Sequence, residues 1–301
     1  MPIVFGAPLA APVIPAPTLV PRKMTWTGFD GSVWDLSATD GPMVMAPGVK
    51  GLHMPPFNVF QSSTPLVPGV ELTGYEIPAR SVYWPINFYS ESVDEWQATY
   101  AGFFNSIHPV EPGVWRVGED DDARELPLTG VFDGSLAFQN DPFVLGWALI
   151  GVELFAPRPL WRGQAKRVPF TLGTGTAFIG ESGGPPFHIE KATSFARAQI
   201  ENVGDEPAYI TWTLQGPLTD VTVGVGGALV DVPDIADGDV LVIDTDPASQ
   251  YATLNGADFN ESLGFQVFAP VPGNSKSGLS IAAAGTGTVE AALVPLFWRA
   301  F

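Results

Sequence analysis

The stretch Ala79-Arg-Ser-Val-Tyr-Trp-Pro-Ile-Asn-Phe-Tyr89 is followed by Ser92-Val-Asp-Glu95, and the first half of the chain is organised around it. β-branched and aromatic residues dominate the first part. Val82, Trp84, Ile86 and Phe88 occupy every second position, which is the spacing of one face of a β-strand. The sequence therefore predicts a strand that carries these four side chains on one face.

After Ser92 the spacing of apolar residues changes to that of a helix, predicted for about 92–107. Ser92 and Glu95 have the spacing of a capping box, and Pro109 ends the helix because it forces the preceding residue out of the α region. One apolar stripe results: Val93, Trp96, Tyr100, Phe103, Phe104 and Ile107. No second helix of this quality is found, so the stripe should pack against a sheet.

The rest of the first half predicts short strands. Met24–Leu36 is expected to form a hairpin anchored on Trp26 and Trp34, with Asp30 and Gly31 as turn residues that adopt positive φ. Further strands are expected at six places: near Val44, at Phe57–Gln61, and then at Gly113–Val117, Arg124–Phe132, Ser135–Phe138 and Phe143–Phe155. The stretch Ala156–Gly163 breaks the pattern and predicts a domain boundary.

The second half predicts only strands, punctuated by turn dipeptides such as Asp237-Gly238 and Asn255-Gly256, as in a β-sandwich or jelly roll. The expected strands are Arg167–Leu172, Thr176–Ile179, Phe187–Ile189, Ala196–Asn202, Ala208–Gln215, Val221–Val225, Val240–Asp244, Tyr251–Leu254, Phe265–Phe268, Gly278–Ala283 and Thr288–Trp298.

Length and composition favour two domains with sizeable cores, since 46% of the 301 residues are hydrophobic. We expect an extended Pro-rich arm at 1–21, one domain at 22–162 and a β-sandwich domain at 168–301. The arm is either a loose terminus or a segment that lies on a neighbouring subunit, which would cover apolar residues such as Ile3, Phe5 and Ile14.

The net charge of −18 argues against nucleic-acid binding and against an anionic membrane surface, because both need clustered cations. The first residues lack the basic region of a signal peptide. The longest apolar run, near Val144–Val152, is too short to span a bilayer. We therefore expect no membrane anchor.

No residue is assigned a catalytic, cofactor-binding or metal-binding role. The chain has no Cys, and its three His (His53, His108 and His188) are scattered, which argues against a zinc site or a catalytic triad. The Gly-rich stretch 171–180 lacks the third Gly of a dinucleotide loop and the Lys of a phosphate loop.

Two acidic groups suggest calcium or glycosidase chemistry, but each has a simpler interpretation. Glu119–Asp122 lacks the alternation and the Gly of a calcium loop, and we expect an exposed hairpin tip. The second group is Asp231, Asp234, Asp237, Asp239, Asp244 and Asp246. We expect these to form turns and to add charge to sheet edges. Asn260–Ser262 matches a glycosylation sequon by pattern only.

Several motifs in fixed order resemble the distal tail proteins of long, non-contractile-tailed phages, which are usually called minor tail proteins in phages of actinobacteria. The resemblance covers nearly the whole chain, and its most specific part is the Asn202-x-Gly-Asp-x-Pro turn followed by Gly238-Asp-Val-Leu-Val-Ile-Asp244. The other motifs are Trp26–Leu36, Gly51–Pro56, Thr211–Gly216, Leu254–Gly256 and Pro272–Ser275.

The resemblance implies a tail-tube-like, ring-forming first domain (the belt), a galectin-like second domain and no catalysis. It further implies a homo-hexameric ring at the tail tip of the virion. This ring would join the tail-tube protein to the tail-tip hub protein and let DNA pass, with the tape measure protein as a further candidate partner. Such a protein is made in the host cytoplasm.

The alternative function is a carbohydrate-binding module that attaches the particle to host glycans, and a weaker one is a glycan hydrolase. A sugar site would need an exposed aromatic side chain on the sandwich, for which Trp212 is the candidate. Burial is the more frequent state of such a residue, so we expect Trp212 to lie in the core.

Overall fold

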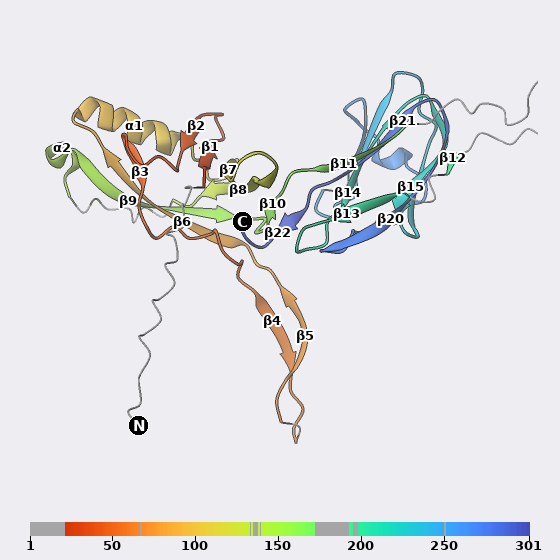
Figure 1. Cartoon of the computed structure of the whole chain (residues 1–301), viewed down its shortest axis with the longest axis horizontal. Coiled ribbons are helices and arrows are strands. Elements are labelled where there is room, and N and C mark those ends of the chain that lie inside the picture. The colour runs from red at the N-terminus through yellow and green to blue at the C-terminus, as the bar shows by residue number, and fades with distance from the viewer. Residues whose placement is uncertain are drawn as a thin grey trace, which may run out of the picture.

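The computed structural model describes residues 22–66, 68–132, 134, 138, 140–171, 193–194, 198–249 and 251–301. It consists mainly of antiparallel sheets, with one long helix, α1 (Val93–Asn105), and one short helix, α2 (Pro142–Leu145). Two hydrophobic cores form two bodies, joined by extended segments (Figure 1). The prediction of a mainly β chain with one substantial helix is confirmed.

The first body contains a curled sheet with strand order β2-β1-β7-β8-β9-β6-β3, and β10 pairs with both β8 and β22 at its side. The strands are β1 (Met24–Thr27), β2 (Val33–Asp35), β3 (Met43–Met45), β6 (Arg80–Tyr89), β7 (Gly113–Val117), β8 (Arg124–Gly130), β9 (Trp147–Ala156), β10 (Trp161–Arg162) and β22 (Leu296–Phe297). The 3₁₀ turn η1 (Asp120–Asp122) connects β7 to β8.

Four tryptophan rings form the centre of this body. Trp84 lies 5.4 Å from Trp26 and 5.2 Å from Trp115, and Trp115 lies 5.0 Å from Trp161, measured between ring centroids. All four side chains are fully buried. The predicted alternation along β6 is confirmed, and the structure shows that this face points into the core, since Val82, Trp84, Ile86 and Phe88 are all buried.

Helix α1 covers this sheet with its apolar stripe, as the sequence predicts. Phe103 is fully buried and lies 5.7 Å from Phe88 on β6 and 5.5 Å from Trp34 on β2. Trp96 is also buried. Val93, at the first turn, is 45% exposed, so the stripe reaches the core only from Trp96 onward.

The predicted capping box is wrong in detail. Ser92 is the N-cap residue, but its side chain makes no capping hydrogen bond. The Ser90 hydroxyl instead donates to Glu95 Oε2 at 2.6 Å and accepts from the Ser92 amide at 3.1 Å. Glu95 is therefore bound by the Ser90 side chain and not by Ser92, the partner expected in a capping box.

Further details of the first body differ from prediction, beginning with the strand β5 (Glu71–Glu76), in a stretch where the sequence predicts a loop. In the β1–β2 hairpin only Gly31 has positive φ, and the Asp30 carboxylate accepts from the amide and hydroxyl of Ser32. The strand expected from Phe143 begins only at Trp147, because Pro142–Leu145 forms α2. Asp141 caps this helix and Gly146 ends it in the left-handed region. The strand expected at Ser135–Phe138 lies mostly outside the described residues, and Phe138 itself is not in a strand.

The second body is a sandwich of two antiparallel sheets, ordered β11-β21-β14-β17-β18-β19 and β12-β20-β15-β16, with β13 beside β20. The strands are β11 (Lys166–Thr171), β12 (Thr193–Ser194), β13 (Gln199–Asn202), β14 (Ile210–Gln215), β15 (Leu218–Val225), β16 (Ala228–Val232), β17 (Val240–Asp244), β18 (Tyr251–Leu254), β19 (Ala257–Asp258), β20 (Ser275–Gly285) and β21 (Thr288–Leu293), with the 3₁₀ turn η2 at Asn260–Ser262.

Most strands predicted for this body are present, with several corrections. The short strands β12 and β19 are additional to the prediction, and the single strand expected at Thr288–Trp298 is divided into β21, in the sandwich, and β22, which pairs with β10 of the first body. Strand β16 was not predicted, although the Gly226-Gly227 pair between Val225 and Ala228 is a hairpin signal. Phe265–Phe268 is not a strand, since it meets β16 only through an isolated bridge at Gln266. The strands expected at 176–179 and 187–189 lie outside the described residues.

The chain leaves the first body and returns to it at neighbouring points. The Gly163 amide donates to the Pro295 carbonyl at 2.9 Å. Next to this hydrogen bond, β10, which precedes Gly163, pairs with β22, which follows Pro295. Ala300 is fully buried in the core of the first body. We propose that the sandwich is inserted into the first domain, whose last part is contributed by residues 296–301.

Candidate functional site

A two-stranded hairpin projects from the first body away from both cores (Figure 1). It consists of β4 (Asn58–Ser62) and β5 (Glu71–Glu76), and every residue of both strands is exposed. Its large apolar side chains are between 52% and 103% exposed: Val59, Phe60, Leu66, Val70, Leu72 and Tyr75. An isolated two-stranded hairpin is marginally stable in water, so this one is suited to packing on another molecule.

A second apolar surface covers α2 and the outer face of β9. Trp147 and Leu149 point outward from β9, each 40% exposed, next to Phe143, Val144 and Leu145 of α2. Phe143 lies 5.8 Å from the buried Trp96 ring of α1, so this surface is continuous with the core. We call these five residues the α2–β9 patch.

Exposed apolar side chains are concentrated in the first body. Among the described residues, the second half exposes only these large apolar side chains: Val203, Tyr251, Phe265, Val267, Val294 and Phe301. Neighbouring exposed apolar side chains of this kind are typical of protein interfaces. The first body therefore carries the candidate assembly surface.

The base of the hairpin is fixed to the sandwich by one carboxylate. Glu206 Oε1 accepts a hydrogen bond of 2.9 Å from the Tyr75 hydroxyl and one of 2.8 Å from Trp298 Nε1. The hydrogen bond from the Tyr75 hydroxyl to Glu206 raises the pKa of Tyr75 above its usual value, because it favours the neutral phenol. Neighbouring Asp205 accepts from the Trp298 amide at 3.0 Å.

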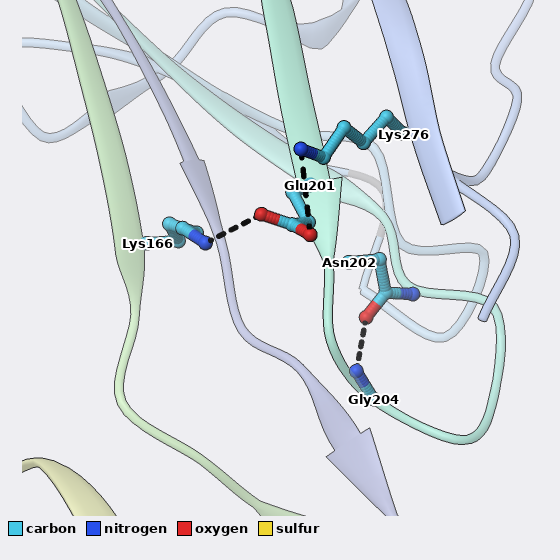
Figure 2. Close-up of polar contacts among 5 residues, drawn as sticks. All are labelled: Lys166, Glu201, Asn202, Gly204 and Lys276. Carbon is cyan, nitrogen blue, oxygen red and sulfur yellow. Dashed lines mark hydrogen bonds and ion pairs between the residues drawn. The ribbon is translucent and has the colours of Figure 1, made fainter. Parts of the chain in front are cut away.

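The turn that carries Asp205 and Glu206 is held by a buried asparagine (Figure 2). Asn202 Oδ1 accepts from the Gly204 amide at 2.9 Å, while its Nδ2 donates to the carbonyls of Glu206 and Val271. Figure 2 also shows that Glu201, the residue before it, pairs with Lys166 and Lys276 at 3.4 and 3.7 Å. The motif that contributes most to the family resemblance therefore builds the junction between the two bodies.

Neither acidic group forms an evident site. Glu119–Asp122 is exposed, as predicted, and Lys23 Nζ lies 4.0 Å from Glu119. Of the six aspartates in the second group, Asp239 accepts from Asn255 Nδ2, while Asp244 and Asp246 accept from amides two residues later. Among the described residues, no group of three or more acidic or histidine side chains is placed to hold a metal ion.

The remaining candidates occupy structural positions. Trp212 is 1% exposed in the sandwich core, so it is not available for stacking on a sugar. His108 Nδ1 accepts from the amides of Val110 and Glu111, and Asn260 Oδ1 accepts from the Ala252 amide. His188 and residues 172–180 of the Gly-rich stretch lie outside the described residues. None of the helices in the described part of the chain is long and apolar enough to cross a membrane.

Solved structures with the same fold come from phage tails. The Dit protein of phage SPP1, described as a paradigm of the hub adsorption apparatus in phages that infect Gram-positive bacteria, superposes with a TM-score of 0.62 at 12% identity, covering 92% of this chain and 99% of that one. A chain of the phage P2 baseplate with Ca, in its activated conformation, gives 0.55 at 12% identity, covering 92% and 98%. The same baseplate with Sr gives 0.54 at 11% identity, covering 91% and 97%. No protein-family model and no curated protein matches the sequence.

Proposed function

We propose that this protein is a structural subunit of a phage tail tip, which assembles with copies of itself into a ring between the tail tube and the tail-tip hub. The shared fold with tail-hub proteins along nearly the whole chain supports this role. The observation that carries the proposal is the exposed apolar hairpin β4–β5. A structural role leaves the protein without chemistry of its own.

The hairpin and the α2–β9 patch are two different apolar surfaces of one body. A contact between the hairpin of one copy and a different surface of the next is heterologous, and such contacts close into a ring when the rotation between copies allows it. Six copies, as the family resemblance implies, would surround a central bore. The tail-tube protein, the hub protein and the tape measure protein are the partners that this placement proposes.

Passage of DNA through the bore requires that the wall does not bind phosphates. A duplex carries about one charge per 1.7 Å of axis, and a chain at −18 has few cations to offer. We propose that Glu119–Asp122 contributes to an acidic inner wall, although Lys23 beside Glu119 partly neutralises that tip. In a cryo-EM structure of an assembled tail tip, an inner wall lined by Arg22, Lys23, Arg116 or Arg124 would contradict this placement.

The test of assembly is the mass and shape of the purified protein, alone and with tail-tube protein. We expect hexamers by native mass spectrometry and rings by electron microscopy. The double variant Phe60→Asp/Leu72→Asp should remain folded by circular dichroism but lose the rings, because two charges in a dry interface cost several kcal/mol. Val267→Asp, at an apolar sandwich position of similar exposure (43%), is the matched control and should assemble. A wild-type chain that stays monomeric in both samples would contradict the proposal.

A further inference from the structure

A pocket of about 560 Å³ opens in the first body where the described chain begins. Leu36 and Val117 are buried in its wall, and Met24, Val44, Val49 and Leu52 are partly exposed around it. Arg22 and Phe301 also line it, with the Arg22 guanidinium 5.1 Å from the centre of the Phe301 ring. Its volume lies within the range of pockets that take small organic ligands, so it has room for a few aliphatic side chains.

The chemistry of the segment 1–21 matches this pocket. It contains no Asp, Glu, Lys, Arg or His, and six of its residues are proline. Its apolar pairs Val13-Ile14 and Leu19-Val20 have aliphatic side chains suited to an aliphatic wall. Proline restricts the conformations of the unbound segment, so the segment loses less conformational entropy when it docks.

We propose that the segment 1–21 binds in this pocket of its own chain and inserts Val13, Ile14, Leu19 and Val20. Arg22 already lines the pocket, and Ile14 is separated from it by only seven residues. Eight peptide units reach at most roughly 26–29 Å, so the pocket lies within the reach of Ile14, and of Leu19 and Val20, which are closer to Arg22 in the sequence. So short a tether gives the segment an effective concentration of the order of millimolar, which a second copy does not match at ordinary protein concentrations.

The absence of cysteine from the chain allows a direct test by disulfide capture in the full-length protein. The double variant Val13→Cys/Ala46→Cys places one thiol in the segment and one at Ala46, which lines the pocket. After mild oxidation we expect a disulfide within one chain, seen by mass spectrometry as a monomer that has lost two hydrogens to the oxidant. The pair Val13→Cys/Glu261→Cys, with the second thiol at an exposed position of the sandwich, is the control and should react at least about tenfold more slowly.

A second pair of variants separates docking from random collision. Adding Ile14→Asp to the capture variant should lower the rate of disulfide formation about tenfold or more, because a carboxylate is disfavoured in an apolar pocket. Thr18→Asp, a charge at a polar position of the same segment, should leave the rate unchanged. Equal rates in the pocket pair and the Glu261 pair would overturn the proposal. A product that is exclusively a disulfide-linked dimer would overturn the choice of the chain's own segment in favour of a second copy.

Discussion

Arg80 on β6 donates a hydrogen bond of 2.7 Å from Nη2 to the carbonyl oxygen of Trp298, a residue 218 positions later in the sequence. Its Nη1 donates to the carbonyls of Gly51 and His53 at 2.6 and 2.8 Å. The side chain is 2% exposed, and burial lowers the pKa of its guanidinium to about 10, so it remains charged at neutral pH. One buried cation thus connects β6, the loop after β3 and the segment that returns from the sandwich, and all its partners are backbone oxygens.

Replacing Arg80 by Ala should destabilise the first body by about 3–5 kcal/mol, because the His53 and Trp298 carbonyls would lose the Arg80 donor in a buried site and the Gly51 carbonyl would keep only its hydrogen bond from Trp161 Nε1. Denaturant unfolding followed by tryptophan fluorescence measures this change. Arg167→Ala is the matched control: Arg167 pairs with Glu290 but its side chain is 62% exposed, so its loss should cost less than about 1 kcal/mol. Equal effects of the two substitutions would show that the Arg80 contacts add nothing beyond a surface pair.

The local elements of this fold are readable from sequence, because their signals lie within a few residues. The alternation in Val82–Phe88, the helical stripe that ends before Pro109 and the turn at Asn255-Gly256 each rest on one short window. The same windows mislead where two signals compete. Phe143–Leu145 has strand-forming residues, but Asp141-Pro142 and Gly146 at its ends impose a helical turn.

The candidate site could be predicted only in part, because its geometry depends on residues far apart in sequence. The exposed apolar residues of β4–β5 have the same composition as a buried strand, so exposure is visible only in three dimensions. The contacts of Glu206 with Tyr75 and Trp298 bridge 131 and 92 positions, and no local pattern marks them. The Asn202 turn is visible as a motif in the sequence, but its place at the junction depends on contacts with residues far away in the chain.

The contact between Tyr75 and Glu206 should depend on pH in the alkaline range. The pKa of Tyr75 is raised in the folded protein, so the folded state holds the phenolic proton more tightly than the unfolded state. The stabilisation is therefore fully present below pH about 10, the usual value, and is lost as the pH rises through the raised pKa. The difference in tyrosinate absorbance between wild type and Tyr75→Phe isolates this titration. Glu206→Gln should shift it to lower pH, and an unchanged midpoint would contradict the contact.

Phe103 should be essential for the first body to fold. It is fully buried between Phe88 and Trp34, so Phe103→Asp places an unpaired charge in the core and should cost at least about 4 kcal/mol. The matched control is Val93→Asp on the same helix, where the side chain is exposed and a carboxylate in the first turn is favoured by the helix dipole. Loss of soluble, cooperatively folding protein in Phe103→Asp alone is expected. A fully folded Phe103→Asp protein would mean that the stripe does not face the core.

If the sandwich is an insertion, it can be removed without loss of the first domain. The Gly163 amide and the Pro295 carbonyl are joined by a hydrogen bond of 2.9 Å, so a short Gly/Ser linker should replace residues 164–294. The fragment 22–163 alone should be less stable than this excised chain by several kcal/mol. It lacks β22, the Trp298 carbonyl that Arg80 binds, and the buried Ala300.

The complementary fragment 164–295 should fold by itself, since the sandwich core lies almost entirely within it. Thermal unfolding measures the stability of the excised chain and of the fragment 164–295. The dispersion of amide signals in their NMR spectra shows whether each one is folded. The fragment 168–301 that the sequence suggests begins two residues into β11 and carries Trp298 without its partners in the first body, so it should be less soluble than 164–295. If the fragment 22–163 is as stable as the excised chain, which also contains residues 295–301, the insertion is contradicted. The returning segment would then contribute nothing to the stability of the first domain.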